Sequence, residues 1–234
     1  MANNYYDATG VLVLDRVTPV ISALFGRFRL EGSHPGNGRA YIARLSEAHV
    51  PEWDGVLLDL ITLAAQLDLP APESDDAQDD SDDVSIQVIL DLLASRFGAQ
   101  EDTDLLNLIE HHGFKGEADL EALFLLATAF DDGHRLVAIE FEGSWYCSKP
   151  LLFEFGGAAS FLSREVRVFR GSSTAIPLGQ ALRKAVVDHD PETAAALIDK
   201  ETQGLFAGIQ DDHFRMGVRQ RVAERLARAP AART

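Results

Sequence analysis

RLVAIEFE, residues 135–142, is the stretch that decides the fold, because the hydrophobic pattern changes its period there. Val137, Ile139 and Phe141 occupy every second position, which is the spacing of a strand with one buried face. The patterns on either side of the strand region are helical. The sequence therefore predicts a mostly helical α+β fold, with helices packed on a small antiparallel sheet at about residues 134–169.

The segments that follow continue the strand pattern in short pieces. Gly143-Ser144 predicts a turn, Pro150 and Gly156-Gly157 interrupt the chain again, and three further strand-like segments lie at residues 145–147, 151–155 and 161–169. Because short connections join successive strands, we expect an antiparallel meander of about three or four strands.

Helical stripes occupy most of the remaining chain. Thr18 can cap a helix that carries Val20, Leu24 and Phe28 at four-residue spacing. The other helices are expected at residues 40–49, 53–69, 86–97, 103–112, 120–130, 178–186, 190–209 and 212–227. Val11–Leu14 predicts a buried strand, and the Gly-rich residues 32–38 predict a loop without regular structure.

The totals favour one soluble globular unit. With 234 residues, of which 46% are hydrophobic, the chain can bury a sizeable core. We expect a single domain over residues 1–234, with a flexible acidic loop at about residues 70–83. The net charge of −16 opposes direct binding to nucleic acid or to anionic membranes, so a basic protein is the expected kind of partner.

The cysteine content indicates a reducing compartment. Cys147 is the only cysteine, so neither an internal disulfide nor a cysteine-based zinc site can form, and among aromatic residues it is typical of a small core residue. The N-terminal residues lack the features of a signal peptide, and no apolar run approaches the roughly 20 residues of a membrane span. A cytoplasmic location is expected.

Carboxylates crowd residues 71–83, which lie between the helices expected at residues 53–69 and 86–97. This segment is the strongest charge feature of the chain. The simplest interpretation is a solvated linker. The functional hypothesis is an anionic surface that binds a basic protein without enzymatic activity or cofactor, with DNA mimicry or suppression of a defence system as specific forms. Its candidate partner-binding residues are Asp75, Asp76, Asp79, Asp80, Asp82, Asp83, Asp91, Glu101, Asp102 and Asp104.

A metal site is the alternative source of function. Carboxylates and imidazoles suit a divalent ion, and a metal-dependent hydrolase or nuclease-like enzyme could use one neighbourhood of such groups. Its residues are Glu110, His111, Asp131, Asp132 and His134. The competing interpretation is that the histidines favour a helix C-terminus and that Asp131-Asp132-Gly133 is a turn. No phosphate-binding loop, dinucleotide fingerprint or nucleophile elbow accompanies them, which argues against an enzyme.

The last helix is the one basic surface that the sequence predicts in an acidic protein. Phe214, Val218, Val222 and Leu226 form its apolar stripe. The same helix holds Arg215, Arg219, Arg221, Arg225 and Arg228. This helix is either an ordinary amphipathic one or a basic surface that pairs with the acidic middle of the chain, within one molecule or in a homodimer.

Three strings resemble an uncharacterised protein family carried by bacterial integrative and conjugative elements. They are NYYDATGVLVLDRVTPVI at residues 4–21, IEHH at residues 109–112 and FLSREV at residues 161–166. The resemblance would cover most of the chain and implies a bacterial cytoplasm and the cargo of a mobile element. It brings no activity and no site residue with it.

Overall fold

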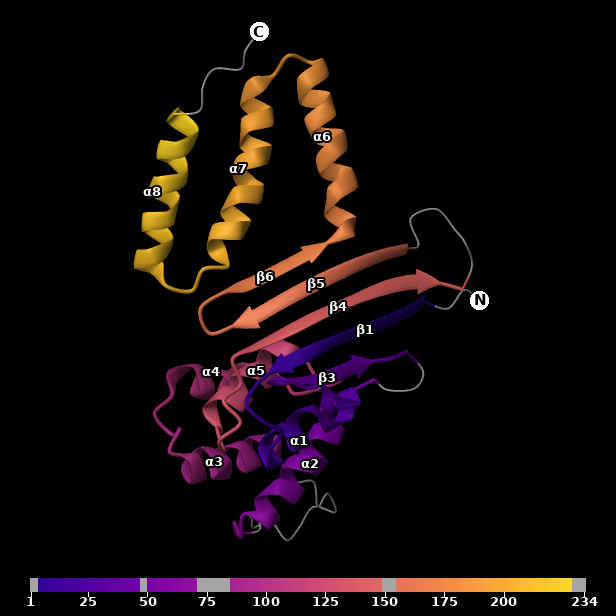
Figure 1. Ribbon diagram of the computed structural model, residues 1–234, viewed down its shortest axis with the longest axis vertical. Helices are drawn as coiled ribbons and strands as arrows, with labels where there is room; N and C mark the ends of the chain where they lie inside the picture. The colour runs from indigo at the N-terminus through magenta and orange to yellow at the C-terminus, as the bar shows by residue number, and fades with distance from the viewer. Residues whose placement is uncertain (1–3, 47–49, 71–84, 149–154, 229–234) are drawn as a thin grey trace. The chain divides into compact units, whose positions relative to one another are not determined.

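The computed structural model describes residues 4–46, 50–70, 85–148 and 155–228 (Figure 1). These residues form eight α-helices, two short 3₁₀ helices and six strands, and the paired strands run antiparallel, which confirms the α+β prediction. The chain divides into two compact units, unit 1 at residues 1–155 and unit 2 at residues 156–234. The single domain over residues 1–234 stays a prediction, and the acidic loop at about residues 70–83 lies almost wholly outside the described residues.

The sheet of unit 1 is built around its first strand. Its order is β2 (Glu31–Pro35), β3 (Arg39–Arg44), β1 (Asn4–Val13) and β4 (Ala138–Cys147). On one face β1 places Leu12 opposite Ile139 and Ala8 opposite Gly143. Leu12 and Ile139 are fully buried, so this face is the one that the helices cover.

Two N-terminal predictions are wrong in the same way. Residues 32–38 were expected as a loop and residues 40–49 as a helix, yet β2 and β3 occupy most of this region. Ala40 and Ile42 are buried and alternate with more exposed positions, which suits a strand paired with β1. Of the four strands in this sheet, only β4 lies within the predicted residues 134–169, and β1, β2 and β3 come from the N-terminal part of the chain. Long-range pairing between strands outweighs the local preference of residues 40–49 for a helix.

The predicted turn at Gly143-Ser144 is also wrong, since β4 continues through it. A Cβ atom at Gly143 would lie 2.5 Å from the Cβ of Ala8. Glycine is required there by the close approach of two strands rather than by a turn. Gly156-Gly157 likewise lies inside β5 (Phe155–Ser163), while residues 151–154 of the predicted strand lie outside the described residues.

Five helices of unit 1 agree with the predicted stripes. They are α1 (Pro19–Phe25), α2 (Trp53–Gln66), α3 (Ile86–Phe97), α4 (Thr103–His111) and α5 (Leu120–Ala129). Thr18 caps α1 as expected, and the carboxylate of Asp102 caps α4. Leu24, Leu60 and Leu90 from three of these helices are fully buried, so unit 1 has a continuous helix-on-sheet core.

Unit 2 is a hairpin followed by three helices. β5 pairs with β6 (Arg167–Gly171), and a 3₁₀ turn at Ser172–Thr174 leads into α6 (Ala175–Val187), α7 (Pro191–Ala207) and α8 (Asp212–Arg228). The three helices stand side by side in one layer, with α7 in the middle (Figure 1).

The end of α7 is tied to the hairpin through backbone hydrogen bonds. The Arg167 N–H donates to the carbonyl of Gly208 at 2.8 Å, and the Gln210 N–H donates to the carbonyl of Glu165 at 2.9 Å. Within the described parts of the chain, no helix has both the length and the apolar composition needed to cross a bilayer.

Candidate functional site

The described acidic candidates lie on one helical region of unit 1. Asp91 lies on α3, Glu101 and Asp102 lie in the connection to α4, and Asp104 lies in the first turn of α4; all four are exposed. Asp102 accepts hydrogen bonds from the N–H groups of Asp104 and Leu105, so part of its charge is used in capping α4. Asp75, Asp76, Asp79, Asp80, Asp82 and Asp83 lie outside the described residues.

Few basic groups offset this region. Over residues 85–134 the sequence holds ten carboxylates against Arg96 and Lys115. Ordered helices and their connections carry these carboxylates, so their positions are fixed relative to one another. We name the set Asp91, Glu101, Asp102, Asp104 and Glu110 the acidic surface. It is a structured source of negative potential in unit 1.

The charge of the whole chain is unevenly divided. Unit 2 contains twelve arginines and lysines and nine carboxylates, for a net charge of +3, which leaves −19 in unit 1. A basic partner would therefore be attracted to unit 1 and not to unit 2.

His134 forms the buried centre of a polar cluster in unit 1. Its ring is fully buried, with Nε2 3.0 Å from the carbonyl oxygen of Ala127 and Nδ1 2.8 Å from Oδ1 of Asp132. Since a carbonyl only accepts, Nε2 carries a proton and donates. The other oxygen of Asp132 accepts the N–H of Val20 at 3.2 Å, and Thr18 Oγ1 lies 3.4 Å from Nδ1. The cluster thus joins the α5–β4 connection to the first turn of α1.

Only part of the predicted metal neighbourhood converges. Asp131, Asp132 and His134 each offer a ligand atom, and these atoms lie within 4.8 Å of one another. Glu110 and His111 do not join this group in the described part of the chain; they are exposed on α4, where His111 Nδ1 lies 3.1 Å from the carbonyl of Asn107. The direct contact between His134 and Asp132 would have to open to admit an ion.

Hydrogen bonding fixes the charge of Asp131 at the edge of this cluster. Burial opposes ionisation, but the N–H groups of Arg135 and Gly133 and the nearby His134 lower the pKa of Asp131 below its ordinary value. Oδ1 of Asp131 accepts the Gly133 N–H at 2.9 Å and the Arg135 N–H at 3.2 Å. These bonds are those of a turn, which agrees with the competing interpretation of the sequence.

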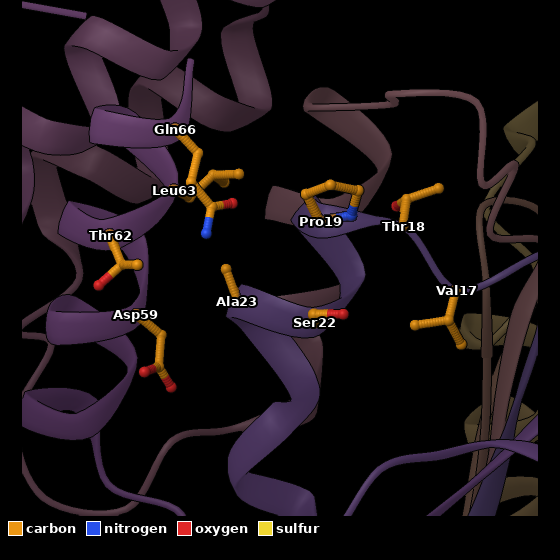
Figure 2. A pocket seen from close by; sticks show the side chains of 9 residues that line it. All are labelled: Val17, Thr18, Pro19, Ser22, Ala23, Asp59, Thr62, Leu63 and Gln66. Carbon is orange, nitrogen blue, oxygen red and sulfur yellow. The ribbon is translucent and has the colours of Figure 1, made fainter. Parts of the chain in front are cut away.

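A groove between α1 and α2 was not foreseen from the sequence. It has a volume of about 560 Å³, and Figure 2 shows its side chains arriving from both helices and from the segment before α1. Its lining residues are Val17, Thr18, Pro19, Ser22, Ala23, Asp59, Thr62, Leu63 and Gln66. Asp59 is its only carboxylate, and both of its oxygens accept hydrogen bonds from Arg27, at 2.7 and 3.0 Å. With that charge paired, the lining residues that the structure describes offer mainly hydroxyl and amide groups to a ligand.

The remaining candidates, Cys147 and the arginines of α8, make contacts within their own units. Cys147 is buried at the end of β4, as expected for a small core residue. On α8, Arg215 donates to the carbonyl of Ile209 at 2.6 Å, and Arg219 lies 5.7 Å from the ring centre of Phe206 on α7. The basic helix is therefore partly engaged within unit 2.

Comparisons of the chain with protein-family models, curated proteins and solved structures find no match.

Proposed function

We propose that the chain is a non-enzymatic interaction protein whose acidic surface binds a basic protein. The single observation that supports this function is the excess of exposed carboxylates on α3, α4 and their connection, where few basic residues offset them. Exposed charges of one sign on ordered elements steer and orient an oppositely charged partner. In this proposal the carboxylates at residues 75–83 add negative potential to that surface.

The setting belongs to the same proposal. The resemblance to a family carried by bacterial integrative and conjugative elements implies a bacterial cytoplasm as the setting of this proposal. Basic partners there include nucleic-acid-binding and defence proteins, for which a DNA-like row of carboxylates would compete with phosphates. The net charge of −19 in unit 1 agrees with binding such a protein and not the nucleic acid itself.

Capture from bacterial lysate tests the proposal. The full chain should retain a basic protein at low salt and release it as the salt rises, because exposed charges are screened. The triple variant Asp91→Asn, Glu101→Gln, Glu110→Gln should weaken binding by about tenfold, at a few tenths of a kcal/mol or more for each exposed charge.

A matched control removes the same charge elsewhere in unit 1. The variant Glu31→Gln, Asp68→Asn, Glu142→Gln changes three exposed carboxylates outside the acidic surface. It should retain the partner nearly as well as the unaltered chain does. If both variants lost the partner equally, binding would depend on the total charge of the chain and not on the acidic surface. If no basic partner bound in a salt-sensitive way, the proposal would be contradicted.

A metal-dependent hydrolase is the second candidate, supported by the convergence of Asp131, Asp132 and His134. Titration with Mg²⁺, Mn²⁺ and Zn²⁺, followed by calorimetry, tests it directly. Binding that disappears in Asp131→Asn would support this candidate. Absence of binding is expected if the cluster serves only to join the α5–β4 connection to α1.

A further inference from the structure

The helices of unit 2 leave most of their apolar side chains uncovered. Ala185 is the only buried residue in α6, α7 and α8, whereas each helix of unit 1 buries at least two. Eight large apolar side chains on these helices are at least half exposed: Ile176, Val186, Val187, Ile198, Leu205, Phe214, Met216 and Leu226. Domains normally contain two packed layers, and α6–α8 form one.

The middle helix shows where the uncovered side lies. Ile198 and Leu205 are seven residues apart and therefore share one side of α7, where they are 58% and 50% exposed. Half-buried Leu197 and Phe206 stand about 100° to either side of this pair. Phe206 faces α8, as its contact with Arg219 shows, so Leu197 faces α6 and the pair lies between the two helix contacts.

The flanking helices extend this side of the layer. Both run antiparallel to α7 (Figure 1), and the half-buried positions on each mark the side that faces α7. From those positions, the 100° step per residue places Val186 of α6 and Phe214 of α8 on the same side as Ile198 and Leu205. We name these four residues the apolar face; they are 50–67% exposed.

The size of the apolar face suits a specific interface. At roughly 100 Å² for each half-exposed large side chain, the four residues offer on the order of 400 Å² of apolar area. A standard interface buries about 800 Å² per partner, of which somewhat more than half is apolar. The arginine stems of α8 and the small residues of α7 can supply the remaining area.

We propose that a second copy of this chain covers the apolar face, centred on Ile198, Leu205 and Phe214 with Val186 at its edge, and that α7 of each copy lies on α8 of the other around a two-fold axis. Charge favours this pairing over the alternatives. α7 carries Glu192, Asp199 and Glu201 against Lys200, while α8 carries five arginines against two carboxylates. Stacking α8 on α6 would instead oppose two basic helices, since α6 holds Arg183 and Lys184 without a carboxylate.

Sedimentation of the full chain over a range of concentrations tests the dimer. The double variant Ile198→Asp, Leu205→Asp should raise the dimer dissociation constant by about 100-fold or more, because it places two charges at the centre of the interface. Leu58→Asp is a control that introduces one such charge away from the apolar face, since Leu58 is 60% exposed on α2 of unit 1. Circular dichroism must show that the helices persist in the variants.

Cross-linking tests the geometry without depending on a disruptive variant. In a Cys147→Ser background, a mixture of two single-cysteine chains, Ile198→Cys and Arg221→Cys, should form a mixed disulfide on oxidation, because the middles of α7 and α8 would meet. Lys200→Cys, on the opposite side of α7, should not react with Arg221→Cys.

Three results would overturn the inference. The first is a chain that stays monomeric at tens of micromolar. The second is a dimer that the double variant leaves unchanged and in which the cysteines at positions 198 and 221 do not cross-link. The third is assembly into species larger than a dimer that added salt abolishes. The last result would show head-to-tail binding of basic α8 to an acidic unit 1. The neutralised acidic surface should leave the dimer intact, so the two proposals fail separately.

Discussion

Both units contain helices with an apolar period, and those of unit 2 are on the whole longer, yet unit 1 buries its apolar stripes and unit 2 leaves most of its own exposed. In α3 the residues Ile86, Ile89, Leu90 and Leu93 all lie in the core. In α8 the equivalent stripe contains Phe214 at 63% and Leu226 at 72% exposure. The difference shows that an apolar period predicts a helix and which of its sides is apolar, but not whether the same chain buries that side.

Replacing one leucine in each unit by alanine should give the largest difference in the free energy of unfolding. Leu60→Ala, which empties a fully buried position on α2, should reduce the free energy of unfolding by about 2–5 kcal/mol. Leu226→Ala on α8 should change it by less than about 0.5 kcal/mol. Urea unfolding separates the units, because both tryptophans, Trp53 and Trp145, belong to unit 1 and report it by fluorescence. Similar losses for the two variants would contradict the comparison.

The buried histidine should show the next largest difference. His134→Leu leaves the carbonyl of Ala127 without its donor and removes the ring nitrogen that contacts Asp132, which should cost about 1–3 kcal/mol of unit 1 stability. His213→Leu changes an exposed residue of α8 and should have little effect. An unchanged fluorescence transition in His134→Leu would show that the cluster does not hold the α5–β4 connection to α1.

Glycine-to-alanine changes should have opposite signs in the two units. A Cβ at Gly10 would lie 2.1 Å from the carbonyl oxygen of Glu140, so Gly10→Ala should destabilise unit 1 by about 1–3 kcal/mol. A Cβ at Gly179 of α6 meets no atom within 4 Å. Gly179→Ala should therefore stabilise unit 2 by about 0.5–1 kcal/mol, measured by circular dichroism. A loss of helix stability in Gly179→Ala would mean that this side of α6 is covered.

The sequence predicted those elements whose signal is local. Helical period, the Thr18 cap and the Asp190-Pro191 start of α7 are all properties of neighbouring residues, and the structure contains each of them. The strands β2 and β3 could not be found in this way, because their pairing with β1 and with each other joins residues distant from one another in sequence.

The candidate sites also differ in how far local sequence could predict them. The carboxylates of the acidic surface are visible in the sequence, and exposure follows from their charge. Convergence of side chains depends on the fold, and so sequence reasoning grouped Glu110 and His111 with His134 although they lie apart from its cluster. The groove between α1 and α2 comes from residues about 40 positions apart, which no local pattern could join.

Acid should weaken each unit through a different aspartate, and this is the smallest effect expected. The pKa of Asp131 is lowered in spite of burial by N–H donors of its own turn, and the pKa of Asp190 is lowered by the hydroxyl and then the N–H of Thr193. A lowered pKa stabilises the fold above the ordinary value near 4, and this stabilisation disappears as the pH falls through the lowered pKa. Asp131→Asn should therefore reduce unit 1 stability at pH 6 and converge with the unaltered chain near pH 2. Asp190→Asn should do the same for the helices of unit 2 alone, read by circular dichroism, because the groups that act on Asp190 lie in the first turn of α7 and the last turn of α6. If either variant moved both transitions equally, the units would unfold together, and the contrast in burial would not extend to their stabilities.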